Sequence, residues 1–216
     1  EICNMRILLV AATSMELAHF LLRHPDADIL LTGVGVPATL YHLYKRLHQI
    51  DYDMVIQAGI AGAISTTLQL GSVHAIYCDV FADIGVNATG GFQSIFEMGL
   101  SNPATFPFSN GRLINKNLHR VNKWKIPVCN AITVNTISDD THLTKFYGEK
   151  YEAELESMEG AALHYVCLQE GVHFLQLRAI SNYVGERNKV NWQIKEAVSN
   201  LSATLDTIYD NIKPEM

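Results

Sequence analysis

Short apolar runs alternate with helix-like stretches along the whole of this chain. The runs are bounded by glycine or polar residues, as expected of strands buried inside a sheet. They occupy residues 6–12, 29–32, 54–58, 73–80, 128–135 and 174–180. Helices are predicted after a cap at Thr13 or Ser14 and over 37–48, 141–147, 159–169 and 192–212. No repeat or linker divides the chain, so one α/β domain with a mixed sheet is predicted over residues 1–216, of which 1–4 are either a tag remnant or an N-terminal extension.

The amino-acid composition excludes several classes of binding partner. A formal charge of -6 argues against nucleic acid, because binding phosphates requires a basic face. No apolar run is long enough to cross a membrane and no secretory leader is recognisable, which predicts a cytoplasmic protein without a membrane partner. The four cysteines show no paired spacing and no His-x-x-x-His pattern occurs, so neither a metal site nor a cofactor is expected.

Two polar positions stand where an α/β sheet binds ligands. Met158-Glu159 precedes Gly160, Ala161 and Ala162, small residues that let a ligand or another backbone approach closely. Asn182 follows the apolar run 174–180, and ligands bind beyond the carboxyl ends of parallel strands. A carboxylate and an amide placed in this way can hold a ribose and a purine.

Two glycine-rich segments, Gly33-Val34-Gly35 and Gly59-Ile60-Ala61-Gly62, are predicted as strand-to-helix turns. Such turns can direct backbone N–H groups at a ligand oxygen, and they also serve helix packing. Neither matches a nucleotide P-loop or a complete dinucleotide-binding motif. Residues 81–110 lack a sustained period and are rich in Gly, Asn and Pro, which is typical of a long binding loop.

Each candidate also has an ordinary structural interpretation. Glu16 is either a solvated carboxylate favoured by the helix dipole or a buried general acid or base with a raised pKa. Glu159 has the same two interpretations, and Asn182 is also a common turn residue. Arg187 and Trp192 fit a surface cation and a helix-anchoring aromatic. No Ser/His/Asp or Cys/His set emerges, which disfavours a nucleophilic mechanism.

Taken together and in order, these segments resemble the nucleoside phosphorylase/nucleosidase superfamily nearly end to end. The resemblance implies a phosphorylase/hydrolase-like, three-layer α/β/α fold. Glu16 falls on the catalytic acid of the methylthioadenosine/S-adenosylhomocysteine nucleosidases, and Gly59, Ile60 and Ala61 on their base-side loop. Met158-Glu159 falls on the ribose-binding pair, and Ser181-Asn182 on a Ser-Asp pair that relays a proton to the purine.

Two departures from that pattern indicate which reaction and which purine to expect. Gln57 stands where the phosphorylases carry a phosphate-binding arginine, and Gly33-Val34-Gly35 has no arginine nearby, so water is favoured over phosphate as the nucleophile. Asn182 replaces an aspartate. Its amide both donates and accepts, and it can donate to the six-position oxygen of hypoxanthine, which a carboxylate would repel. An unpaired buried polar atom costs about 1–3 kcal/mol, so a 6-oxopurine is predicted.

Residues 57–62 and 181–188, together with Trp192, specifically resemble the futalosine hydrolases, which release hypoxanthine from futalosine in the alternative menaquinone pathway. The resemblance implies a dissociative mechanism. Glu159 would hold the ribose hydroxyls, Glu16 would deprotonate the attacking water, Asn182 would stabilise the leaving base and Met158 would lie under the sugar. A base-stacking segment is expected near residues 134–138.

The benzoate end of futalosine needs a further contact. Arg187 matches a carboxylate bidentately, and a structural role for Arg187 fits equally well. Four aromatic side chains are candidates to cover the ring of the benzoate, although core packing is the favoured role of each: Phe81, Phe92, Phe96 and Trp192. The resemblance also implies a homodimer or higher homo-oligomer, in which a partner subunit completes the pocket near residues 92–108.

Three other functions fit the same residues. The first is a methylthioadenosine/S-adenosylhomocysteine or aminofutalosine nucleosidase, which differs only in the base. The second is a 6-oxopurine nucleoside phosphorylase, and the third is a non-catalytic nucleoside-binding module on the same fold.

Overall fold

The computed structural model describes residues 5–89, 91–118, 123–186 and 188–212. Most of the predicted strands and helices are present, but they do not alternate throughout, because no α-helix of the described residues interrupts the strands between residues 54 and 133. The strands are β1 (Ile7–Ala11), β2 (Ile29–Leu31), β3 (Met54–Ala63), β4 (Val73–Asp79), β5 (Gly85–Ala88), β6 (Gly91–Ser94), β7 (Leu113–Ile114), β8 (Val128–Thr133), β9 (Leu155–Ser157) and β10 (His173–Tyr183). The helices are α1 (Ala18–Arg23), α2 (Val36–Leu47), α3 (Thr141–Tyr151), α4 (Gly160–Glu170) and α5 (Ile194–Ile212), with short 3-10 turns η1 (Ser14–Glu16) and η3 (Lys189–Asn191). The expected terminal segment 1–4 lies outside the described residues.

The central sheet is mixed, as predicted, and part of it closes on itself. Its strand order is β10-β4-β8-β9-β3-β1-β2, and β10 also pairs with β3 in parallel over nearly its whole length. The β10–β4 and β3–β9 pairs are antiparallel, whereas β1–β2, β1–β3, β4–β8 and β8–β9 are parallel. β3 therefore contacts three strands, and its carboxyl half lies at the centre of the fold.

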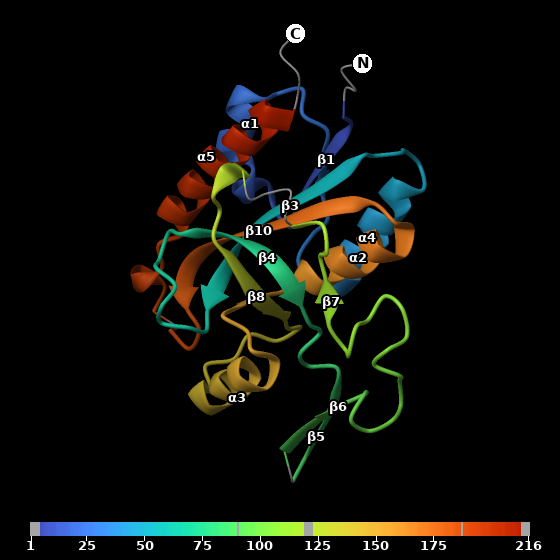
Figure 1. The fold of residues 1–216 in the computed structure, drawn as a ribbon. Coiled ribbons are helices and arrows are strands. Elements are labelled where there is room, and N and C mark those ends of the chain that lie inside the picture. The colour runs from blue at the N-terminus through green and yellow to red at the C-terminus, as the bar shows by residue number, and fades with distance from the viewer. Residues whose placement is uncertain (1–4, 90, 119–122, 187, 213–216) are drawn as a thin grey trace.

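Helices cover both faces of the sheet, which gives the predicted three layers. Figure 1 shows α1 and α5 on one side and α2 and α4 on the other. The alternation along β1 explains this, because successive side chains of a strand point to opposite faces. Leu9 packs with the α1–α5 layer and Leu8 with the α2–α4 layer, and both are fully buried.

The structure corrects the sequence prediction in three places. Residues 59–62 are not a strand-to-helix turn but the second half of β3. The three-residue strand β9 was not predicted, because it is too short to show a period. The long segment after β4 contains a two-stranded hairpin, β5–β6, which projects from the lower end of the molecule in Figure 1, and then the short strand β7.

Within the described part of the chain, no helix is long and apolar enough to cross a membrane.

Candidate active site

A cavity of about 210 Å³ opens where the carboxyl ends of β1, β3, β8 and β10 meet β9. Most of the residues predicted from the sequence to form the site line it: Glu16, Ile60, Ala61, Met158, Glu159 and Asn182. Folding therefore brings together side chains from distant parts of the chain. Glu156 and Ser157 also line the cavity, and sequence reasoning missed both because it missed β9.

Glu16 is buried, with only 5% of its surface exposed, so the interpretation as a solvated carboxylate is wrong. Thr13 fixes one oxygen, since its backbone N–H and its hydroxyl both donate to Oε2 at 2.9 and 3.2 Å. The backbone N–H of Ile60 donates to Oε1 at 3.1 Å. Burial raises the pKa of Glu16, and the nearby Arg178 and these backbone donors offset only part of that rise. The carboxylate is held in place and is poised to accept a proton.

Glu159 is the N-cap residue of α4 and is 6% exposed. Its Oε1 accepts a hydrogen bond of 3.0 Å from the backbone N–H of Gly35. Gly35 has φ 93, a left-handed backbone conformation that explains why this residue is glycine. The Gly33-Val34-Gly35 segment thus directs an N–H at a protein carboxylate as well as starting α2.

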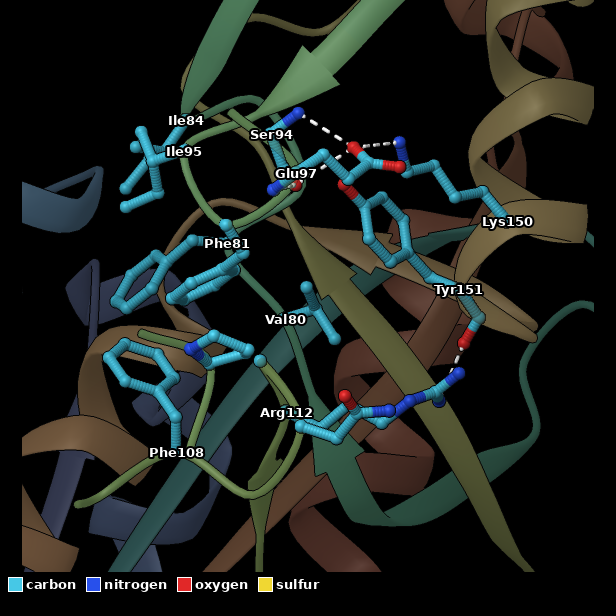
Figure 2. Close-up of a pocket in the computed structure, with 14 residues that line it drawn as sticks. Val80, Phe81, Ile84, Ser94, Ile95, Glu97, Phe108, Arg112, Lys150 and Tyr151 are labelled. Carbon is cyan, nitrogen blue, oxygen red and sulfur yellow. Dashed lines mark hydrogen bonds and ion pairs between the residues drawn. The ribbon is translucent and has the colours of Figure 1, made fainter. Parts of the chain in front are cut away.

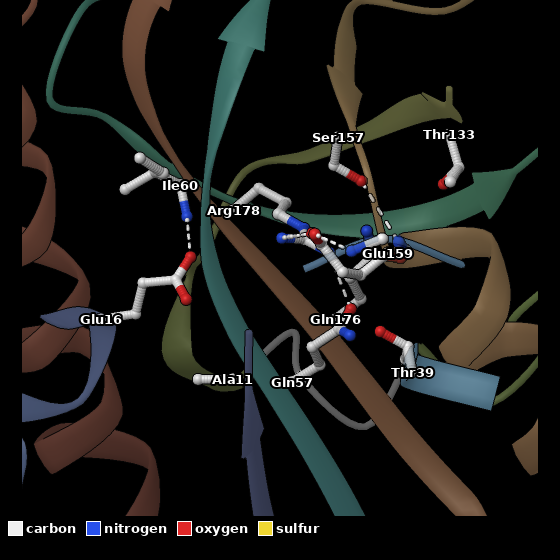
Figure 3. A network of polar contacts seen from close by, with 12 residues as sticks. Ala11, Glu16, Thr39, Gln57, Ile60, Thr133, Ser157, Glu159, Gln176 and Arg178 are labelled. Atoms are coloured by element: carbon white, nitrogen blue, oxygen red, sulfur yellow. Dashed lines mark hydrogen bonds and ion pairs between the residues drawn. The ribbon is translucent and has the colours of Figure 1, made fainter. Parts of the chain in front are cut away.

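Arg178 lies near both glutamates, a placement that the sequence analysis does not predict. Its Nη1 is 3.5 Å from Oε2 of Glu159, and its Nη2 donates to Oε1 of Gln57 at 2.8 Å. Figure 3 shows the guanidinium inside this polar network. Arg178 is 1% exposed and does not line the cavity. An arginine within a buried apolar strand was the available sequence signal, because a buried charge requires a partner.

Gly59 makes room for this guanidinium. β3 and β10 pair so that Gly59 lies opposite Arg178. A Cβ at Gly59 would lie 2.3 Å from Nη1 of Arg178 and 3.0 Å from Oε1 of Glu16. Gly59 is therefore not a lining residue of the cavity, although the sequence predicts a substrate contact. Its lack of a Cβ leaves room for the Arg178 side chain to extend from β10 past β3.

Asn182 has both ends of its amide oriented by neighbouring residues. Its Oδ1 accepts a hydrogen bond from the hydroxyl of Ser181 at 2.8 Å, and its Nδ2 donates to the carbonyl of Tyr183 at 3.0 Å. The β10–β3 register shifts between Ile180 and Asn182, and this irregularity accompanies the placement of Asn182 in the cavity wall. Each amide atom keeps capacity for one further hydrogen bond to a ligand.

Apolar side chains complete the wall. Val134 and Ile137 line the cavity, at the segment where the sequence predicts base stacking. Trp192 also lines it, and its indole N–H donates to the carbonyl of Glu186 at 2.9 Å. Arg187 lies outside the described residues.

The aromatic residues of the long loop are placed elsewhere. Phe81 and Phe96 line a separate cavity of about 370 Å³ (Figure 2), and Phe92 packs against Tyr147. Phe81, Phe92 and Phe96 therefore do not line the cavity that holds Glu16 and Glu159, and of the four aromatic candidates only Trp192 does. Among the residues with a described placement, no cluster of three His, Cys, Asp or Glu side chains forms a metal site.

Comparison with known proteins agrees with this geometry. Residues 13–210 match the phosphorylase superfamily. The futalosine hydrolase of Thermus thermophilus is 30% identical over 176 residues, which cover 80% of this chain and 76% of that protein. The futalosine hydrolase of Streptomyces coelicolor is 28% identical over 187 residues, covering 83% and 77%. A methylthioadenosine/S-adenosylhomocysteine nucleosidase of Geobacillus is 25% identical over 173 residues, covering 78% and 72%.

Solved structures show the same fold. The native futalosine hydrolase of Helicobacter pylori superposes with a TM-score of 0.79 at 15% identity, over 96% of this chain and 98% of that one. The methylthioadenosine/S-adenosylhomocysteine nucleosidase of Campylobacter jejuni gives a TM-score of 0.75 at 18% identity, over 96% and 98%.

Proposed function

Because the chain belongs to the phosphorylase superfamily, we propose that it hydrolyses the N-glycosidic bond of futalosine and releases hypoxanthine. The observation that carries the proposal is the convergence of Glu16, Glu159 and Asn182 on one cavity. Two buried carboxylates and one oriented amide supply a base, a sugar-binding group and a base-binding group. Futalosine is proposed as the substrate because two of the relatives are futalosine hydrolases.

The charge arrangement favours water over phosphate as the nucleophile. None of the described residues that line the cavity is Lys, Arg or His. The buried Arg178 does not line the cavity, and its guanidinium is already bound to Glu159 and Gln57. Phosphate would therefore have to enter a cavity whose charged groups are carboxylates, at a high electrostatic cost.

Catalysis follows from the placement of each group. As the bond from C1′ to the purine lengthens, the ribosyl ring gains positive charge, and hydrogen bonds from its hydroxyls to Glu159 strengthen. Glu16 takes a proton from the attacking water, whose oxygen bonds to C1′. The electron pair of the broken bond leaves with hypoxanthine, and the remaining N–H of Asn182 stabilises that charge. Met158 packs under the sugar.

The rest of the substrate has fewer defined contacts. Trp192 is the aromatic side chain best placed to cover the benzoate ring, because it borders the cavity. Arg187 stays a prediction as the partner of the benzoate carboxylate, and a cytoplasmic location stays a prediction as well.

A second copy of the chain is the proposed partner. Exposed apolar side chains gather on and beside α2, where Val34, Tyr41 and Tyr44 are 58%, 61% and 51% exposed. On the long loop, Leu100 and Phe106 are 70% and 63% exposed. Exposed groups of this size are typical of interfaces, and light scattering after gel filtration would test for a homodimer or higher oligomer.

A 6-amino nucleosidase is the second candidate, because nucleosidases for methylthioadenosine and S-adenosylhomocysteine are also relatives. Incubating the purified protein with futalosine, inosine and methylthioadenosine, with and without phosphate, separates the candidates. We expect hypoxanthine from futalosine at a rate independent of phosphate. Adenine release as the faster reaction would favour the 6-amino nucleosidase, and phosphate-dependent turnover would favour a phosphorylase. Tight binding without any base release would favour a binding module.

A further inference from the structure

Asp79 is a fully buried carboxylate that does not line the catalytic cavity. It is the last residue of β4, and three donors from three parts of the sheet bind it. Oδ1 accepts from the backbone N–H of Val80 at 2.8 Å and from the hydroxyl of Thr133 at 2.9 Å. Oδ2 accepts from Nε2 of Gln176 at 3.1 Å. Such a group requires an explanation, because burying a carboxylate is costly.

The hydroxyl of Thr133 connects Asp79 to the start of helix α4. A hydroxyl carries one hydrogen, and Thr133 donates it to Asp79. Its lone pairs therefore face the opposite way, and Oγ1 accepts from the backbone N–H of Ala161 at 2.7 Å. This N–H belongs to the first turn of α4 and has no partner within the helix. The carboxylate thus sets the direction of the bond that holds the start of α4.

Gly160 places the start of α4 directly on the same pair of side chains. A Cβ at Gly160 would lie 2.1 Å from Nε2 of Gln176 and 2.2 Å from Oδ2 of Asp79. Only glycine allows this approach. The residue before Gly160 is Glu159, whose carboxylate contacts Gly35 and Arg178. Separate sets of contacts therefore fix the start of α4 next to Glu159 and the carboxylate of Glu159.

We propose that Asp79 is a positioning residue for Glu159, acting through the hydroxyl of Thr133 and the close packing of Gly160. The inference rests on the proposed role of Glu159 in holding the ribose hydroxyls. The tether sets the backbone of the N-cap residue of α4, and the Gly35 N–H and Arg178 then set its carboxylate.

Two substitutions at Thr133 test the tether. Thr133→Val keeps the shape of the side chain and removes the hydroxyl, whereas Thr133→Ser keeps the hydroxyl. We expect kcat/KM to fall about ten- to a hundredfold in the valine variant, since small misplacements of a positioned group have effects of this size. The serine variant should retain most of the activity.

A sugar-dependent readout separates positioning from loss of stability. We would compare kcat/KM for the nucleoside with that for its 2′- or 3′-deoxy analogue, because the missing hydroxyl removes a contact to Glu159. The preference for the hydroxylated substrate should shrink severalfold in Thr133→Val and stay near the wild-type value in Thr133→Ser. An equal loss for both substrates in the valine variant, or no loss, would overturn the proposal.

Asp79→Leu provides the second variant. It keeps the approximate size of the side chain and removes both oxygens that accept from Val80, Thr133 and Gln176. The same shrinkage of the sugar preference is expected, and an unchanged preference counts against the tether. If the wild-type protein released no purine from any substrate, the proposed function would be wrong, and the kinetic tests of the tether could not be made. Amide hydrogen exchange then tests the tether alone: the Ala161 N–H should lose protection in Thr133→Val and Asp79→Leu but not in Thr133→Ser, and unchanged protection would refute the tether.

Discussion

Arg178 and Glu159 form an ion pair inside the protein, with 3.5 Å between Nη1 and Oε2 and side chains that are 2% and 8% exposed. Glu16 lies close enough for the same guanidinium to lower its pKa. One buried cation therefore serves two carboxylates of the site. The guanidinium pairs with the carboxylate of Glu159 and offsets part of the rise in the pKa of Glu16 that burial causes.

Glu16→Gln and Glu159→Gln should each lower kcat by at least about a hundredfold. Glutamine keeps the shape of either side chain. At position 16 it cannot take a proton from water, and at position 159 it removes the charge that binds the ribose hydroxyls and pairs with Arg178. Steady-state kinetics with futalosine measures the effect. Glu170→Gln is the matched control, because Glu170 ends the same helix α4 away from the cavity. Near-normal turnover in either site variant would remove that residue from the mechanism.

Arg178→Gln should move the acidic limb of the pH–rate profile to higher pH. Burial raises the pKa of Glu16 above its ordinary value of 4.5, and Arg178 is the largest influence that lowers it again. The base must be ionised, so kcat/KM falls as pH drops through this pKa. Without the guanidinium the pKa of Glu16 rises further. Measuring kcat/KM against pH in both proteins checks the shift, and a limb that stays in place or moves to lower pH would contradict the assignment of Glu16 as the base.

Asn182→Asp should change the preferred base. The carboxylate repels the six-position oxygen of hypoxanthine and accepts from a six-amino group, whereas the hydroxyl of Ser181 can still donate to it. A mispaired buried polar atom costs about 1–3 kcal/mol, so the ratio of kcat/KM for futalosine and its 6-amino analogue should shift about tenfold or more toward the amino substrate. A ratio equal to that of the wild type would mean that Asn182 does not read the base.

Asp79 should make the protein less stable as pH rises. Burial raises its pKa from 3.8 to about 6. Because the folded value lies above the unfolded value, this group contributes stability that is present below pH 3.8 and lost as pH rises through about 6. The loss amounts to about 3 kcal/mol, at about 1.4 kcal/mol per unit of pKa.

Urea unfolding at several pH values measures this contribution. Asparagine does not titrate, so the free energy of unfolding of Asp79→Asn should fall less over the interval than that of the wild type. Parallel stability profiles for the two proteins would show that Asp79 does not titrate in this range.

Local sequence pattern was enough to predict most of the framework. Strand β1 is a continuous apolar run, and its burial on both faces is a direct consequence of that composition. The glutamate at the start of α4 was recognisable because small residues follow it. β9 was missed because three residues carry no periodicity, and the Gly-rich half of β3 was taken for a turn because glycine is typical of turns.

The sequence by itself determined the class of fold, the order of its elements and the identity of the two glutamates and the amide in the cavity. Only the tertiary structure decided that Glu16 is buried and that Arg178 lies near both glutamates. The physical reason is that the position of Arg178 depends on the register of β10 against β3. That register places Arg178 opposite Gly59, and the absence of a Cβ at Gly59 leaves room for the guanidinium to reach Glu159. Contacts of this kind join residues far apart in the chain, so no local pattern records them.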